Sequence, residues 1–236
     1  MPARVDIVLP CYNPGENWSL ELLKFHKEAS VFYDIRYVLV NDGSSATGLE
    51  SKIHQLHQQK IPIEVISYAP NKGKGYALRK GVAESKADYT VYTDIDFPFT
   101  NNSMMTLMNV LVNEQKDVVA GFRSEAYYQK NMTGFRVLLS KSFRFFLRKI
   151  VKLPVSDTQC GLKGFNLKGR EKFLNTTINR YLFDFEFIYA SCRDTTLKMA
   201  TVEVTLKENV VFRSMKLKIL LQETINLCTV LLFKRN

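Results

Sequence analysis

Asp94 and Asp96 form an Asp-x-Asp motif that directly follows the apolar stretch Tyr89–Thr93. Two carboxylates at this spacing can both approach one hard divalent cation, which in turn can bridge the oxygens of a diphosphate. The same motif also occurs in ordinary solvated turns, so its surroundings decide between the two interpretations. We expect Asp94 and Asp96 to bind Mg²⁺ or Mn²⁺.

A basic, glycine-containing segment, Lys72–Gly75, lies upstream and opens a predicted helix. At a helix N-terminus, backbone N–H groups and the ammonium groups of Lys72 and Lys74 can face an anion. The segment lacks the GxxxxGK[ST] spacing of a Walker loop, and a loop with solvated lysines is the alternative. It is nevertheless a second candidate for phosphate binding.

A third polar segment, Asn41–Ser45, follows another apolar stretch. Its serines can cap the next helix, but capping does not require Asp42, which makes Asp42 a candidate for ligand binding. His54 and His57 lie three positions apart on a predicted helix without a third metal ligand nearby. We expect these two histidines on a solvated helix face.

Strands and helices alternate through the first half of the chain, which is typical of βαβ units and a parallel sheet. The predicted strands are Arg4–Leu9, Ile35–Val40, Ile63–Ser67, Tyr89–Thr93 and Asp117–Ala120. The predicted helices are Trp18–Ser30, Leu49–Gln59, Gly75–Ser85 and Ser103–Asn113. Ligands of such sheets bind beyond the carboxyl ends of the strands, and the polar segments above fall at those ends.

The second half opens with a helical pattern from Phe135 to Leu153, where one face is apolar and the other is basic. The basic face consists of Lys141, Arg144, Arg148 and Lys152. Such a helix can lie in a membrane interface, and a core helix with a solvated back is the alternative. The predicted elements that follow are a polar loop at Ser156–Lys163, a helix at Phe183–Cys192, a strand at Met199–Leu206 and a closing helix at Ser214–Phe233.

Composition and charge limit the class of protein. The chain has 236 residues, of which 46% are hydrophobic and 12% aromatic, as expected for one globular domain. Its net charge of +10 indicates an anionic partner, either nucleic acid, a membrane surface or a phosphorylated small molecule. The four cysteines are far apart, which favours a reducing cytosol over a disulfide framework or zinc site. We find no leader pattern and no window of about 18 apolar residues, so we expect peripheral membrane attachment.

Several motifs occur in a fixed order over residues 5–215. They are Val8–Asn13 with Glu16, Val40–Ser45, Asn71–Arg79, Asp94–Asp96, Gly121–Arg123 and Asp157–Phe165, followed by Phe183–Glu186. In this order the chain resembles the family-two glycosyltransferases and, within them, the polyprenyl-phosphate (dolichyl-phosphate) hexosyltransferases. Two positions depart from the family pattern. Asn41 stands where many relatives have an aspartate, and Phe97–Phe99 stands where some relatives have a further polar ligand.

The resemblance implies a GT-A fold, which is an α/β, Rossmann-like, mostly parallel sheet flanked by helices, here with amphipathic helices towards the C-terminus. Together with the motifs above, it implies donor-binding roles for Pro10, Tyr12, Asn13, Glu16, Asn41, Asp42, Lys72, Lys74 and Asp94. It implies catalytic roles for Asp96, Arg123, Asp157 and Lys163, with Arg123 and Lys163 near phosphates. It implies acceptor-side or other roles for Gln159, Asp184, Glu186 and Arg213.

The expected activity is inverting transfer of a hexose from a nucleotide sugar to a polyprenyl phosphate at the cytoplasmic face of a membrane. The resemblance favours a UDP-hexose over GDP-mannose. A divalent cation and basic groups would stabilise the charge of the leaving diphosphate. A phosphate acceptor is already anionic near neutral pH because its second pKa is about 6, so it needs no strong base. A hydroxyl acceptor needs one, and Asp157, Asp184 and Glu186 are the candidates.

Two other functions stay open on the sequence. One is a glycosyltransferase acting on a sugar or lipid hydroxyl in surface-polysaccharide synthesis, and the other is a non-enzymatic nucleic-acid-binding protein. Because the basic cluster shares a helix with an apolar face, we expect an anionic membrane surface rather than nucleic acid. We expect one domain, with a nucleotide-sugar-binding half at 1–123 and an acceptor and membrane-proximal half at 124–236. A membrane-anchoring partner is compatible with this organisation.

Overall fold

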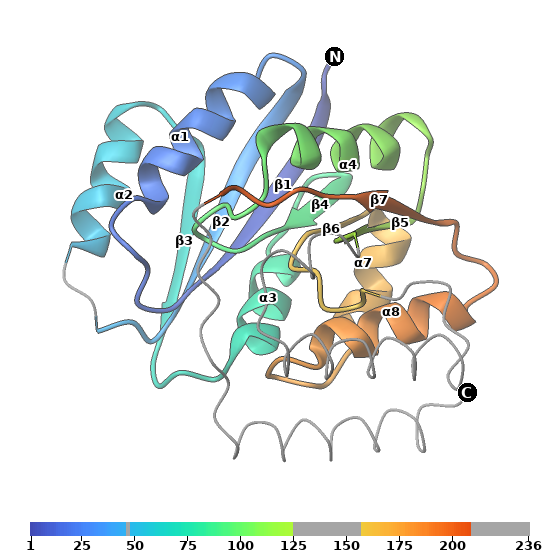
Figure 1. Ribbon diagram of the computed structural model, residues 1–236. Coiled ribbons are helices and arrows are strands. Elements are labelled where there is room, and N and C mark those ends of the chain that lie inside the picture. The colour runs from blue at the N-terminus through green and yellow to red at the C-terminus, as the bar shows by residue number, and fades with distance from the viewer. Residues whose placement is uncertain (46–47, 125–156, 209–236) are drawn as a thin grey trace.

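The computed structural model describes residues 1–45, 48–124 and 157–208 and shows a seven-stranded, mostly parallel sheet between two layers of helices (Figure 1). The strands are β1 (Ala3–Cys11), β2 (Tyr33–Asp42), β3 (Ile63–Tyr68), β4 (Tyr89–Tyr92), β5 (Val118–Phe122), β6 (Lys163–Phe165) and β7 (Met199–Glu203). The described helices are α1 (Trp18–Ala29), α2 (Leu49–Gln58), α3 (Lys74–Ala83), α4 (Asn101–Asn113), α7 (Leu167–Leu174) and α8 (Phe183–Arg193). The mostly parallel α/β fold expected from the sequence is confirmed.

The strand order is β3-β2-β1-β4-β6-β5-β7, so the chain reverses its direction of travel across the sheet between β1 and β4. Both of these strands run parallel, with Val8 opposite Tyr92. A sheet of this kind opens a crevice where the strand order switches, beyond the carboxyl ends of the strands on either side. The switch point here is flanked by Pro10 and Cys11 at the end of β1 and by the acidic motif after β4.

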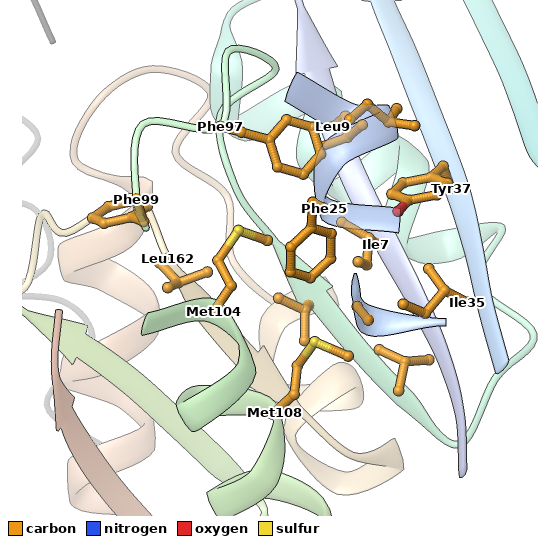
Figure 2. Close-up of a cluster of buried hydrophobic side chains, with 14 of the residues drawn as sticks. Ile7, Leu9, Phe25, Ile35, Tyr37, Phe97, Phe99, Met104, Met108 and Leu162 are labelled. Carbon is orange, nitrogen blue, oxygen red and sulfur yellow. The ribbon is translucent and has the colours of Figure 1, made fainter. Parts of the chain in front are cut away.

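Two hydrophobic clusters cover the two faces of the sheet. One lies under α1, α2 and α4, and the other lies under α3, α7 and α8. Central strands buried on both faces read as continuous apolar runs, which explains why Val5–Leu9 shows no polar alternation except at Asp6. Figure 2 shows the first cluster, where Phe25 of α1 and Phe97 meet with ring centroids 5.8 Å apart.

The region after residue 156 differs from the prediction. Lys163 does not end a polar loop but begins β6, which pairs antiparallel with both β4 and β5. A strand of three residues containing Lys163 and Gly164 has no recognisable β pattern, and pairing on both sides forms it instead. Helix α7 is not predicted from the sequence either. Its N-cap is Asn166, whose side chain accepts hydrogen bonds from Lys168 N and Gly169 N.

The other predicted elements within the described ranges occur with shifts of a few residues at their ends. The helices expected at Phe135–Leu153 and Ser214–Phe233, together with Arg213, lie outside the described residues. Among the helices that the structure describes, none is both long enough and apolar enough to cross a bilayer.

Candidate active site

The acidic motif forms a tight turn at the end of β4. Phe97 N donates a hydrogen bond to the carbonyl of Asp94 at 3.0 Å, and Phe97 has a φ of 47°, which is unusual for a residue other than glycine. Ile95 and Phe97 are buried in the core, as Figure 2 shows for Phe97. Burial of these two side chains anchors the turn and leaves Asp94 half-buried and Asp96 exposed.

Lys74, the first residue of α3, forms an ion pair with Asp94. Gly161 lies against the same carboxylate, because a Cβ atom added there would be 2.9 Å from Asp94 Oδ2 and 3.5 Å from Lys74 Nζ. The residue therefore has to be small for the segment before β6 to approach the acidic turn. Three segments far apart in sequence thus meet at Asp94.

The acidic turn affects the pKa values around it. Burial by itself would lower the pKa of Lys74, but the negative charges of Asp94 and Asp184 raise it above the ordinary lysine value. Partial desolvation and the charge of Asp94 raise the pKa of Asp96. Asp96 thus carries a carboxylate whose charge is poorly compensated by the protein, which suits a cation ligand.

The donor set of this turn fits Mg²⁺ or Mn²⁺. No group of three or more His, Cys, Asp or Glu side chains suited to a metal occurs within 1–45, 48–124 and 157–208. Asp94 and Asp96 therefore offer two carboxylates, and Mg²⁺ is commonly held by one or two carboxylates, with water and substrate phosphates completing its shell. Such a cation would be held chiefly together with a diphosphate.

The glycine-containing segment before α3 has a different role from the expected anion cradle. The buried carboxylate of Asp42 accepts hydrogen bonds from Lys72 N at 2.7 Å, Gly73 N at 2.9 Å and Asn71 Nδ2 at 2.8 Å. Gly73 adopts a φ of 103°, which side-chain-bearing residues rarely take. Asp42 thus holds the segment through its backbone N–H groups.

The next backbone N–H groups are also occupied. Gly75 N and Tyr76 N donate to the carbonyl of Asn179, at 2.8 and 3.3 Å. A Cβ atom on Gly75 would lie 2.4 Å from the carbonyl oxygen of Ile178, so the contact needs a glycine. The expectation that these backbone groups face an anion is therefore wrong in this structure, because protein oxygens already accept their hydrogen bonds. The side chains of Lys72 and Lys74 are what this segment offers to a phosphate.

Arg123 and Asp157 form a nearly buried ion pair that joins the end of β5 to the segment before β6. Asp157 accepts hydrogen bonds from Arg123 Nε and Nη2, both at 2.8 Å, and from Arg123 N at 2.9 Å. Burial by itself would raise the pKa of Asp157, but Arg123 lowers it, so Asp157 stays a carboxylate. Asp157 orients Arg123 at the carboxyl end of β5.

Lys163 and Asp184 form a second pair, deeper in the fold. Lys163 Nζ donates to Asp184 Oδ1 at 2.7 Å and to the carbonyl of Cys160 at 2.5 Å. Tyr92 donates its hydroxyl hydrogen to the same Asp184 oxygen at 2.5 Å. Lys163 has no exposed surface. Its ammonium thus joins β6 to α8 and, in this structure, is not exposed to a phosphate, contrary to the expectation from the sequence.

Glu186 is also engaged internally. Its carboxylate accepts hydrogen bonds from the backbone N–H groups of Thr177 and Ile178, at 3.0 and 2.8 Å. Arg79 of α3 contacts the same loop and donates to the Ile178 carbonyl at 2.8 Å. Glu186 and Arg79 thus fix the loop whose Asn179 carbonyl receives the N-terminus of α3.

Most of the remaining candidates lie near the carboxyl ends of β1 and β2, whereas Lys72 precedes α3 and Gln159 precedes β6. Tyr12 and Glu16 are exposed, and Pro10 is half-buried. Asn13 accepts a hydrogen bond from Ser45 N at 3.0 Å, and Asn41 accepts one from Ser44 N at 2.9 Å. Lys72 has its ammonium 4.7 Å from the ring centre of Tyr76, and Gln159 is exposed. Arg213 lies outside the described residues.

Sequence reasoning missed several residues that position the site. Tyr92 and Asn179 carry no motif signal, because one is part of an apolar strand and the other acts through its backbone carbonyl. Arg79 and Gly161 lie within recognised motifs but received no role. For Gly161, the signal was available as a glycine inside a polar loop next to a predicted site.

The strand order with its switch point, the acidic turn and the basic residues around it define the class as a doubly wound, mostly parallel α/β protein. The chain belongs to glycosyl transferase family 2, whose family model matches residues 6–174. It is 26% identical over 204 residues to human dolichyl-phosphate beta-glucosyltransferase and 28% identical over 222 residues to that of Saccharomyces cerevisiae. These alignments cover 79% and 80% of this chain. The chain spans only 62% and 63% of the length of those relatives.

Solved structures support the same fold. Glucosyl-3-phosphoglycerate synthase from Mycobacterium tuberculosis, crystallised with Mn²⁺, UDP and glucosyl-3-phosphoglycerate, superposes with a TM-score of 0.63 at 17% identity. Mannosyl-3-phosphoglycerate synthase from Rubrobacter xylanophilus gives a TM-score of 0.67 at 17% identity. The matches cover 98% and 97% of this chain and 79% and 72% of those chains. They establish a GT-A architecture for the chain.

Proposed function

We propose that this protein is a metal-dependent glycosyltransferase that moves a hexose from a UDP-sugar to a polyprenyl phosphate. The observation that carries the proposal is the acidic turn at the switch point, where Asp96 is exposed and Asp94 contacts Lys74. The family relatives are named for transfer of glucose to dolichyl phosphate, and a neighbour in fold was crystallised with UDP and Mn²⁺. UDP-glucose is therefore the first donor to test, with GDP-mannose as the alternative.

The chemistry needs charge stabilisation at the leaving group. Breaking the bond between the anomeric carbon and the diphosphate leaves negative charge on the diphosphate. Mg²⁺ or Mn²⁺ bound at Asp94 and Asp96 would supply positive charge at that position. Lys74 pairs with Asp94, and Asp157 holds Arg123 at the carboxyl end of β5, which is two strands away from β4 in the sheet. These side chains bind and orient the diphosphate.

The buried carboxylates favour a phosphate acceptor over a hydroxyl acceptor. Asp157, Asp184 and Glu186 were the candidate bases, and their exposed fractions are 4%, 4% and 1%. Each accepts hydrogen bonds from protein groups, so none is placed to take a proton from an acceptor hydroxyl. A phosphate acceptor needs no such base, because it is already anionic near neutral pH.

Attachment to a membrane completes the proposal. The tail of a polyprenyl phosphate stays in the bilayer, so the site has to reach the membrane surface. We assign this contact to the basic amphipathic pattern at Phe135–Leu153, and we place the protein peripherally at the cytoplasmic face. A membrane-anchoring partner would serve the same purpose.

The deciding experiment combines donor binding with acceptor choice. Calorimetry with UDP-glucose, other UDP-hexoses and GDP-mannose, each with and without Mn²⁺, identifies the donor and its metal dependence. Incubation of the radiolabelled donor with polyprenyl phosphate or with free glycan then identifies the acceptor. We expect metal-dependent binding of a UDP-hexose and label in the lipid fraction. Label in the glycan alone would instead indicate the hydroxyl-directed transferase.

A further inference from the structure

We propose that Lys74 is a built-in competitor of the divalent cation, whose ammonium neutralises Asp94 in the metal-free protein and must leave this carboxylate when the cation binds. The inference rests on the proposed function in placing the cation at Asp94 and Asp96. It adds that the protein opposes this cation until a diphosphate arrives.

The position of Lys74 is fixed by its neighbours. Gly73 N donates to the Asp42 carboxylate at 2.9 Å, and Gly75 N donates to the Asn179 carbonyl at 2.8 Å. The backbone is thus held on both sides of Lys74, so the ion pair with Asp94 is set by the fold. Only the side chain of Lys74 can move when Asp94 acquires another partner.

The surroundings of Asp94 restrict where that partner can bind. One oxygen, Oδ1, contacts Lys74, and the other, Oδ2, faces Gly161, where a Cβ atom would be 2.9 Å away. Asp96 is exposed by contrast. A cation can therefore reach Asp96 directly, whereas coordination by Asp94 as well requires Lys74 to leave this carboxylate.

The displaced ammonium needs a new anion. A lysine close to a bound divalent cation is repelled by it, and the repulsion is relieved when a diphosphate lies between the two positive charges. Lys74 should therefore weaken cation binding in the absence of nucleotide and strengthen nucleotide binding in the presence of the cation. The cation and the diphosphate would then bind cooperatively, and such coupling acts equally on both ligands.

The test measures Mn²⁺ binding directly, from the loss of the free-ion electron paramagnetic resonance signal, without nucleotide. Lys74→Met should tighten Mn²⁺ binding by roughly tenfold relative to the wild type, a change well above that of a typical surface charge. Lys80→Met is the matched control, since it removes the same charge from an exposed position of the same helix. It should leave the Mn²⁺ affinity within twofold. Lys74→Arg, which keeps the charge, should behave like the wild type.

Two further measurements complete the design. With saturating Mn²⁺, Lys74→Met should bind UDP several-fold more weakly than the wild type. The substitution thus weakens nucleotide binding, although it tightens the binding of Mn²⁺ alone. In an Asp94→Asn background, Lys74→Met should lose most of its effect on Mn²⁺. Thermal unfolding of each variant checks that the fold is kept, and Lys74→Gln replaces Lys74→Met if the latter unfolds.

The outcomes separate the inference from the proposed function. Equal or weaker Mn²⁺ binding by Lys74→Met, or an equal gain in Lys80→Met, would overturn the role of Lys74 even if the protein transfers hexose. A tenfold gain confined to Lys74→Met would support the role of Lys74 even if no hexose donor were used.

Discussion

Lys163 Nζ lies 2.7 Å from Asp184 Oδ1, and Lys163 is completely shielded from solvent. Removing one partner of such a pair leaves the other charge buried and uncompensated. We expect Lys163→Met to lower the free energy of unfolding by about 3–5 kcal/mol, measured by urea denaturation. Replacing both residues, as in Lys163→Met with Asp184→Leu, should recover part of the loss. Wild-type stability with abolished transfer would instead make Lys163 a catalytic group.

Asp96→Asn should abolish transfer while the fold is kept. The carboxylate is a proposed cation ligand, and its raised pKa shows that its charge is disfavoured in the metal-free protein. Loss of the charge should therefore leave the melting temperature equal to or above that of the wild type without metal. Asp94→Asn should lose most activity as well. Steady-state turnover at saturating donor and Mn²⁺ is the measurement, and unchanged turnover in Asp96→Asn would exclude the metal assignment.

Asp157→Asn should reduce turnover more than donor affinity. The carboxylate holds Arg123 through two side-chain hydrogen bonds at 2.8 Å, and an amide offers one acceptor in place of two. Arg123→Ala should cost about 1.5–3 kcal/mol of phosphate binding if its guanidinium contacts the substrate. Measuring both kcat and the dissociation constant of the donor for each variant distinguishes an effect on turnover from an effect on donor binding. A loss of donor affinity at constant kcat would place Asp157 in the nucleotide site.

Acid should destabilise the protein through Asp6. Burial by itself would raise the pKa of this carboxyl, but hydrogen bonds from Arg36, Ser85 and two backbone N–H groups lower it from 3.8 to about 2. Since the folded-state pKa is the lower one, the stabilisation is present above pH 4 and is lost as the pH falls towards 2. The shift corresponds to about 2 kcal/mol.

Urea denaturation at pH 6 and at pH 2 measures this contribution. The difference in stability between the wild type and Asp6→Asn should narrow by about 2 kcal/mol at the lower pH. Asp34→Asn is the control, because Asp34 is exposed and lies 3.7 Å from Arg4. At pH 6 this substitution at an exposed position should cost far less stability than Asp6→Asn. A constant difference for Asp6→Asn would mean that the carboxyl titrates normally in the folded protein.

Peripheral membrane binding should depend on the basic residues predicted on one face of Phe135–Leu153. Sedimentation with liposomes should require anionic lipid and weaken at high salt, since each basic residue near an anionic leaflet contributes about 1 kcal/mol. Changing Lys141, Arg144, Arg148 and Lys152 to Gln should reduce the bound fraction. Binding that does not depend on anionic lipid, on salt or on these four residues would place the membrane contact in another part of the protein. No binding would favour a soluble acceptor.

The sequence predicted the parallel half of the fold well because buried strands there are continuous apolar runs ending in polar turns. It located the acidic turn for the same reason, since Asp94 follows such a strand directly. It did not predict β6, because Lys163–Phe165 becomes a strand only through its two neighbours. Nothing in the sequence indicates that β6 runs antiparallel to β4 and β5.

The roles within the site were harder to predict than their positions. Asp42, Asp184 and Glu186 were expected to meet ligands, and each instead accepts hydrogen bonds from other parts of the protein. A carboxylate that binds a substrate and one that holds a loop look the same in sequence. What separates them is burial and the supply of nearby N–H groups, and both depend on contacts distant in the chain.

The reversed direction of β6 has a consequence for how this protein could diversify. Since β6 runs antiparallel to β5, the chain leaves the sheet at the carboxyl end of β5 and re-enters it at the same end. There Arg123 pairs with Asp157, which lies 34 positions further along the chain. The two ends of the intervening segment are thereby tied together at their base. Lengthening a segment closed in this way costs little, because the entropy of loop closure grows only with the logarithm of its length. The length and sequence of this segment could thus change while the sheet and the acidic turn stay in place.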